Sequence, residues 1–314
     1  MRLLYLAAAG SMLLGCTLGD PEDEGVTSQA IETHNRLASN RLASNRLASN
    51  RLASNRLASN RLASNKLVAL EDTSEILDTE EGRDVYSYIV SCALPDTYTI
   101  EADVPGAPDT APPDTTYTCT AEHCTFSGGL GVAPRWIDHR LDKKGQAWVS
   151  ACLFARVNAN DTAESISMRG DNAGLAVSPE EMELYTAEEG AFYGNLFIND
   201  PDPGVEPDWH ACRGEAKAAC PGDVGCGAGL ANRDCAQEDP ANPGYTYCGF
   251  KYDGDCRDFT PSTPSGSACR VYDPELGTYD RCRGEVDHGH GHGHGHGCSR
   301  KQYREVVTTW VANN

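Results

Sequence analysis

The chain has 314 residues, 39% of them hydrophobic and 23% charged, and its formal net charge is −20 at pH 7. A chain this acidic repels nucleic acid, so we exclude a nucleic-acid-binding function and expect metal ions or a basic protein as partners. The length is sufficient for one sizeable core and a smaller second unit.

The N-terminal residues have the pattern of an export signal. Arg2 precedes an apolar run over 3–14, which is shorter than the roughly 20 residues of a membrane-spanning helix. The run ends in LLGC at 13–16, which resembles the bacterial lipobox, where the Cys is acylated and the chain is cleaved before it. We expect 1–15 to be a lipoprotein signal peptide and Cys16 to carry the lipid that holds the protein on a membrane. The alternative is an ordinary signal peptide with an incidental Cys16.

A tandem repeat follows an acidic spacer. Residues 35–64 are six identical copies of NRLAS, and a decayed copy occupies 65–69. A period of five turns each Leu by about 140° around a helix and places successive Leu on opposite faces of a strand, so neither structure gains an apolar face. We therefore predict that 16–67 is a disordered tether. The alternative is a short β-helix, because the repeat weakly resembles the pentapeptide-repeat pattern.

Residues 68–208 have the pattern of an α+β globular domain. Apolar residues at helical spacing predict a helix over 71–94 that stops at Pro95, and the capping sequence SPEE at 178–181 predicts the start of another. The apolar segment 146–157 predicts either a buried helix or a central strand. Strands are expected at 98–104, 116–126 and 191–198.

A Cys-rich, loop-dominated unit is expected over 209–298, followed by a C-terminal strand or tail over 299–314. Of the fourteen Cys, thirteen follow Cys16, and an exported chain with this density predicts a disulfide framework. Because thirteen is odd, at least one thiol is free, paired between chains, or used otherwise. Two pairs are predicted within the α+β domain: Cys92 with Cys152, which lie in the two most apolar segments, and Cys119 with Cys124, which would close a small loop.

A His-Gly tract is the feature with the clearest potential chemistry. Five His alternate with Gly before Cys298, and neutral imidazoles and a thiolate are ligands that Zn, Ni or Cu prefer. The alternative is an expansion of low complexity without a function, as the N-terminal repeat also suggests. The candidate metal ligands are His288, His290, His292, His294 and His296.

Catalytic signatures are missing from the sequence. It contains no nucleophile elbow, no zinc-protease helix motif and no phosphate loop. His123 beside Cys124 and His210 near Cys212 could be drawn as Cys/His pairs, but disulfide formation is the expected fate of these cysteines. We therefore predict that the protein is not an enzyme, with an envelope enzyme kept as the less favoured alternative.

Four strings resemble uncharacterised Cys-rich secreted lipoproteins of myxobacteria, a family for which no activity is known. The resemblance extends over about 80–285, and it implies a domain extent and an extracytoplasmic location only. We expect a lipid-anchored envelope protein that displays a binding or structural domain, with metal capture by the His-Gly tract as the alternative. Thr17 after Cys16 favours the outer membrane or cell surface over the inner membrane. The strings are YSYIVSCALP, QAWVSACLFARVN, EGAFYGNLF and YTYCGFKYDGDCRDF.

Overall fold

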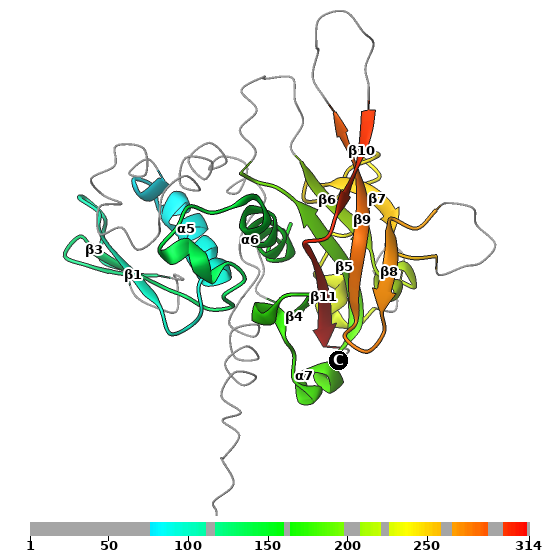
Figure 1. Cartoon of the computed structure of the whole chain (residues 1–314), viewed down its shortest axis with the longest axis horizontal. Helices are drawn as coiled ribbons and strands as arrows, with labels where there is room; N and C mark the ends of the chain where they lie inside the picture. Colours follow the sequence, from blue (N-terminus) through cyan, green and yellow to red (C-terminus); the bar gives the residue numbers. More distant parts are fainter. Residues whose placement is uncertain are drawn as a thin grey trace, which may run out of the picture.

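The computed structural model is a layered α/β structure (Figure 1). No helix among the described residues is long and apolar enough to cross a membrane. The expected signal peptide, the lipidation site at Cys16 and the repeat tether lie outside the described residues. The described residues are 76–110, 117–159, 164–197, 208–220, 226–258, 266–287 and 298–312.

The two long helices lie in the first half of the described residues, and the last five elements are all strands. The helical segments are α5 (Glu80–Ala93), η1 (Pro134–Ile137), α6 (Lys143–Ala155), η2 (Ala173–Leu175), α7 (Pro179–Leu184), α8 (Glu215–Ala218) and α9 (Ala228–Ala231). The strands are β1 (Thr99–Asp103), β2 (Thr118–Thr120), β3 (His123–Ser127), β4 (Ile166–Arg169), β5 (Tyr185–Gly194), β6 (Trp209–Arg213), β7 (Lys251–Asp255), β8 (Cys269–Asp273), β9 (Thr278–Asp287), β10 (Cys298–Tyr303) and β11 (Val306–Ala312).

The layers follow from three sheets and two long helices. The small sheet β1-β3-β2 packs on α5, and α5 packs on α6. Helix α6 in turn covers one face of the sheet β4-β11-β5-β6-β7, and the sheet β10-β9-β8 packs against β11, β5 and β7 (Figure 1). The five-stranded sheet is therefore buried between helices on one side and a second sheet on the other.

Local signals place both long helices. Helix α5 begins after Thr79, whose hydroxyl accepts a hydrogen bond from the backbone N–H of Gly82, and it ends two residues before Pro95. Helix α6 begins after Asp142, whose carboxylate accepts from the backbone N–H of Gly145. The segment 146–157, for which helix and strand were both open, is therefore helical up to residue 155.

The predicted helix start at Ser178 is confirmed, because its hydroxyl accepts from the backbone N–H of Glu181. The expected strand over 116–126 is instead a hairpin of β2 and β3. Its turn places Ala121 and Glu122 at positive φ, 50° and 66°. This conformation could not be predicted from the sequence, because neither residue is Gly.

Strand β5 is buried on both faces. The side chain of Phe192 packs in the main core with α6, whereas Ala191 and Tyr193 pack in a second apolar cluster between the two sheets. This double burial explains why Ala191, Phe192 and Tyr193 follow one another without alternating polar residues. The domain boundary expected at residue 208 falls inside this sheet, because β6 and β7 pair alongside β5 and the C-terminal β11 lies between β4 and β5. Residues from both sides of it share one main core.

A buried ion pair joins the helical layer to this sheet. Arg233 donates to Glu189 Oε2 at 2.6 and 2.8 Å, and both side chains are fully buried. The same guanidinium donates to the carbonyl oxygens of Ala155 and Val157 at the end of α6. Thr309 of β11 donates a third hydrogen bond to Glu189 Oε2, at 2.8 Å. One carboxylate and one guanidinium therefore connect α6, β5, β11 and the Cys-rich segment.

Six disulfides link the described residues. Two of them, Cys92–Cys152 and Cys119–Cys124, are the pairs expected from the sequence: the first ties α5 to α6, and the second joins β2 to β3. The others are Cys212–Cys256, Cys220–Cys226, Cys235–Cys248 and Cys269–Cys282. These twelve cysteines leave Cys298, the first residue of β10, as the odd member of the thirteen that follow Cys16.

We predict that the substitution of Cys92 and Cys152 by Ala lowers the free energy of unfolding by about 4 kcal/mol, because the bridge closes a loop with a sequence separation of 60. The same substitution of Cys119 and Cys124, with a separation of 5, should cost only about 2 kcal/mol. Denaturant unfolding of the two double variants measures the difference, and equal losses would contradict a loop-entropy origin.

Candidate functional site

The C-terminal hairpin presents the His-Gly tract. Strands β9 and β10 pair antiparallel, and Asp287 lies opposite Cys298 at the last pair of the ladder. The tract, with His288, His290, His292, His294 and His296, connects these two strands and lies outside the described residues. Both ends of the tract are therefore held at one point by the sheet.

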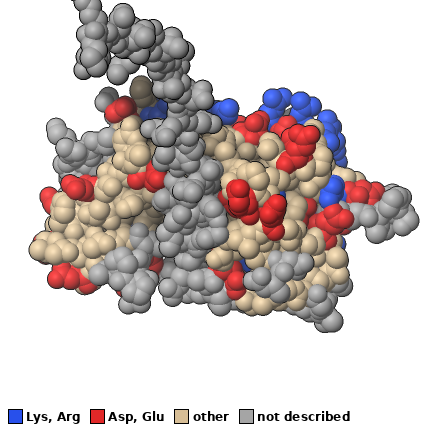
Figure 2. Space-filling model, turned by 90° about the horizontal axis from the view of Figure 1, so that it is seen from below, with Lys and Arg blue, Asp and Glu red and all other residues tan. Residues whose placement is uncertain are grey.

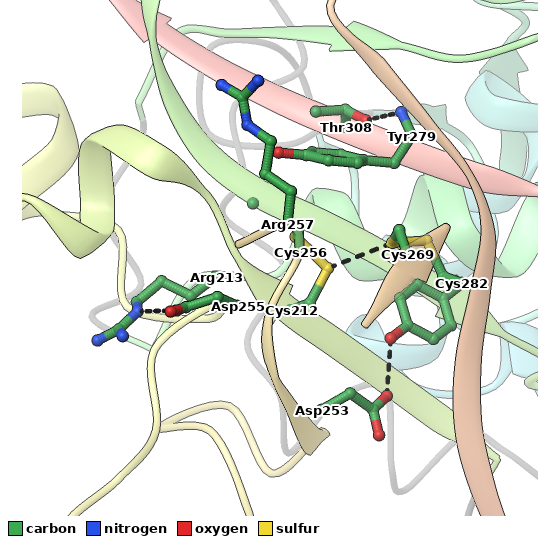
Figure 3. Close-up of a disulfide and its surroundings, with 12 residues drawn as sticks. Cys212, Arg213, Asp253, Asp255, Cys256, Arg257, Cys269, Tyr279, Cys282 and Thr308 are labelled. Carbon is green, nitrogen blue, oxygen red and sulfur yellow. Dashed lines mark hydrogen bonds and ion pairs between the residues drawn. A yellow bond between two sulfur atoms is a disulfide. The ribbon is translucent and has the colours of Figure 1, made fainter. Parts of the chain in front are cut away.

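Two disulfides lie side by side beneath this hairpin (Figure 3). One joins Cys212 of β6 to Cys256, and the other joins Cys269 of β8 to Cys282 of β9. The sulfurs of Cys212 and Cys269 are 3.7 Å apart, and all four cysteines are buried. Three of the sulfurs lie within 4.8 Å of one another, as in a metal site. Thiolates are needed to bind a metal, and these sulfurs are in disulfides, so the cluster is a packing contact between one disulfide of each sheet.

A buried histidine lies where the two sheets meet. His210 Nδ1 is 2.9 Å from Asp253 Oδ2, and its Nε2 is 3.2 Å from Asp208 Oδ1. The hydroxyl of Tyr193 donates to Asp253 at 2.8 Å, and that of Tyr303 on β10 donates to Asp208. The two carboxylates therefore hold the imidazole at both nitrogens while tyrosines from β5 and β10 close over them.

Packing around the imidazole leaves no free space. The ring of Tyr193 stacks parallel to that of His210 with a centroid distance of 5.6 Å. Gly284 of β9 lies against the ring, since a Cβ at this position would be 2.4 Å from His210 Cε1. Any larger residue at 284 would push the hairpin away from β6.

Hydrogen bonds and charge oppose the effect of burial on this network. Burial alone would lower the pKa of His210, but the hydrogen bonds to Asp208 and Asp253 raise it above the usual value. Burial alone would likewise raise the pKa of Asp208, but donors from His210, Lys301 and Tyr303 lower it to about 2. Lys301 Nζ lies 2.8 Å from Asp208 Oδ2. When His210 is protonated, two cations balance two carboxylates at the base of the hairpin.

This network cannot serve as a general base for an external ligand. The side chain of His210 is 0% exposed, and both ring nitrogens are occupied by carboxylates. The Cys/His pairs drawn from the sequence do not form either. Cys212 is bridged to Cys256, Cys124 is bridged to Cys119, and the ring of His123 lies 2.9 Å from Asp103. Each of the twelve cysteines from Cys92 to Cys282 belongs to a disulfide.

The sequence predicted the His-Gly tract at the tip of the hairpin but not the buried network around His210. The tract, Cys298 and the closing strand were visible as patterns, whereas Asp253, Gly284 and Lys301 lie far apart along the chain and none belongs to a motif. The only local signal was His210, two residues from Asp208 and two from Cys212. Alternation on a strand places these three side chains on one face.

Comparison with protein-family models, with curated proteins and with solved structures gave no match for this chain.

We predict that the His210 network stabilises the fold in a pH-dependent way. The folded pKa of His210 is raised, so its contribution is complete below the unfolded value of about 6.5 and is lost as the pH rises through the folded pKa. The folded pKa of Asp208 is lowered to about 2, so its contribution is present above its unfolded value and lost as the pH falls toward 2.

Unfolding free energies between pH 6 and pH 9 check this prediction. The chain with His210→Asn should lose stability and also lose part of the decline that the unmodified chain shows as the pH rises. Exposed His139 offers a matched control, since His139→Asn leaves the network intact. An identical pH profile for the His210→Asn chain and the unmodified chain would refute the assignment.

Proposed function

We propose that this protein is a cell-envelope lipoprotein whose folded part is a disulfide-stabilised binding domain outside the cytoplasm. The observation that carries the proposal is the six disulfides of the described residues, since bridges of this number persist in oxidising compartments. The proposal assigns the protein no catalytic step, and its partner is a ligand or a basic protein.

The N-terminal residues attach the protein to the membrane in this proposal. In this proposal Cys16 carries the lipid, 16–67 is the tether, and the folded part stands away from the membrane surface. The charge supports this arrangement, because Asp and Glu outnumber Lys and Arg by 46 to 26. Figure 2 shows carboxylates spread over one face of the folded part, with most of the visible Lys and Arg at its upper right. Such a surface is repelled by anionic lipid headgroups.

Metal capture at the His-Gly tract is the second candidate function. The observation that favours it is the hairpin register, in which Asp287 and Cys298 face one another at the two ends of the tract. Because the strand pairing fixes both ends of the tract, the entropy cost of bringing several imidazoles to one metal ion is lower than in a free chain. Zn, Ni and Cu are the metals that these ligands suit.

We predict that Cys16→Ser abolishes membrane attachment, because acyl chains on this residue supply the binding free energy, at about 0.8 kcal/mol for each buried methylene. Detergent phase partitioning of cell fractions measures the change. Cys298→Ser is the matched control, since it also removes a single thiol and should leave the partitioning unchanged. A cleaved Cys16→Ser chain that still enters the detergent phase would exclude the anchor.

We predict that Zn and Ni bind the tract at pH 7 and are released toward pH 5, because imidazoles with a pKa of about 6.5 take up protons in competition with the metal. Calorimetric titration of the unmodified chain and of a chain with Gln at the five His positions 288, 290, 292, 294 and 296 measures this. Calcium should bind neither protein in this way, because it prefers oxygen ligands. Equal Zn affinity in both proteins would place the metal elsewhere.

A further inference from the structure

A cavity lies at the start of α6, on the helical side of the five-stranded sheet. Its volume is about 1180 Å³, enough for a small organic molecule. It is formed by η1, the loop that leads into α6, the first turn of α6 and the segment that contains η2. Neither the disulfide cluster nor the His210 network contributes to it.

The walls of the cavity are fixed by hydrogen bonds and buried rings. Asn172 Nδ2 donates to the carbonyl oxygen of Val132 at 3.1 Å, which ties the η2 segment to the residues before η1. Gln146 Nε2 donates to the carbonyl oxygen of Leu141, at 3.1 Å. The floor includes Trp136 and Trp148, which are 1% and 3% exposed. The cavity is therefore preformed.

The charge of the cavity is opposite to that of the whole chain. Four permanent cations line it, together with His139 and only two carboxylates, Asp142 and Asp171. One of the two carboxylates is already engaged, since Asp142 caps α6 by accepting from Gly145 N–H at 2.7 Å. In a chain of net charge −20, these four cations make a local region of positive electrostatic potential. The four cations are Arg135, Arg140, Lys143 and Lys144.

Hydrogen-bond donors exceed acceptors in this cavity. The side chains of the four cations are exposed, and no ion pair to any of them occurs among the described residues. The indole N–H of Trp148, which also lines the cavity, is buried and meets no acceptor there. Guanidinium groups bind carboxylate and phosphate in a bidentate manner, and ammonium groups add point charge.

We propose that this cavity binds a small anion that carries at least two negative charges on phosphate or carboxylate groups. The four cations bind the anionic groups, and Val132, Ala133 and Leu141 form an apolar wall beside any uncharged part of the ligand. The site is independent of the His-Gly tract and of the lipid anchor. It gives the proposed binding domain a ligand class, and this inference therefore rests on that proposed function.

Calorimetric titration of the purified full-length chain tests the proposal, with pyrophosphate and citrate as separate probes at low ionic strength. We expect saturable binding of at least one probe, at one site, with an affinity that falls as salt is added. Tighter binding of pyrophosphate identifies phosphate as the preferred group, and tighter binding of citrate identifies carboxylate. The absence of saturable binding for both probes overturns the proposal.

A pair of variants locates the site. Arg140→Gln with Lys144→Gln removes two cations from the cavity and should weaken binding by about tenfold or more, because each charge-assisted hydrogen bond is lost. Arg270→Gln with Arg304→Gln is the matched control, since both residues are exposed, lie outside the cavity, and carry the same total charge. An equal loss in both variants, or no loss in the first, overturns the assignment. In either case the membrane attachment through Cys16 can still be measured separately, so a failure of this site is distinguishable from a failure of the proposed envelope location.

Discussion

The buried pair of Glu189 and Arg233 is the interaction on which the layered arrangement depends. Three hydrogen bonds converge on Glu189 Oε2, and the removal of either charged partner would leave an uncompensated charge in the core. Helix α6 has no basic residue in its last turn, and Arg233 supplies the missing cation to its terminal carbonyl groups from a distant part of the chain. The same guanidinium holds the carboxylate of β5. The helical layer and the central sheet therefore cannot shift independently.

The second sheet is attached by a different kind of interaction. Between the five-stranded sheet and β8-β9-β10 the apolar core is small, and it contains one disulfide from each sheet, packed side by side. Tyr303 and Lys301 of β10 donate hydrogen bonds to Asp208, beside β6, and so join the two sheets. The result is a rigid base from which the hairpin projects. By contrast, the cationic cavity is built on the helical side and shares none of these groups.

Much of the secondary structure could be predicted from the sequence, because it depends on local signals. The capping groups of Thr79, Asp142 and Ser178 and the stop at Pro95 are all visible in a few neighbouring residues. The mixed α/β class and two of the six disulfides also followed from local patterns. The parts that could not be predicted are the long-range ones: the shared sheet across residue 208, the partners of Arg233, and the cavity, whose wall residues are separated by up to about forty positions.

The position of β11 in the sheet has a consequence for how the protein reaches its folded state. Residues 306–312 lie between β4 and β5 and pair with both, so an interior strand of the five-stranded sheet comes from a segment far downstream of both neighbours. Until that segment is in place, β4 and β5 each have an open edge. Pairings of such long sequence separation form slowly. The five-stranded sheet can therefore close only after this long-range pairing has formed.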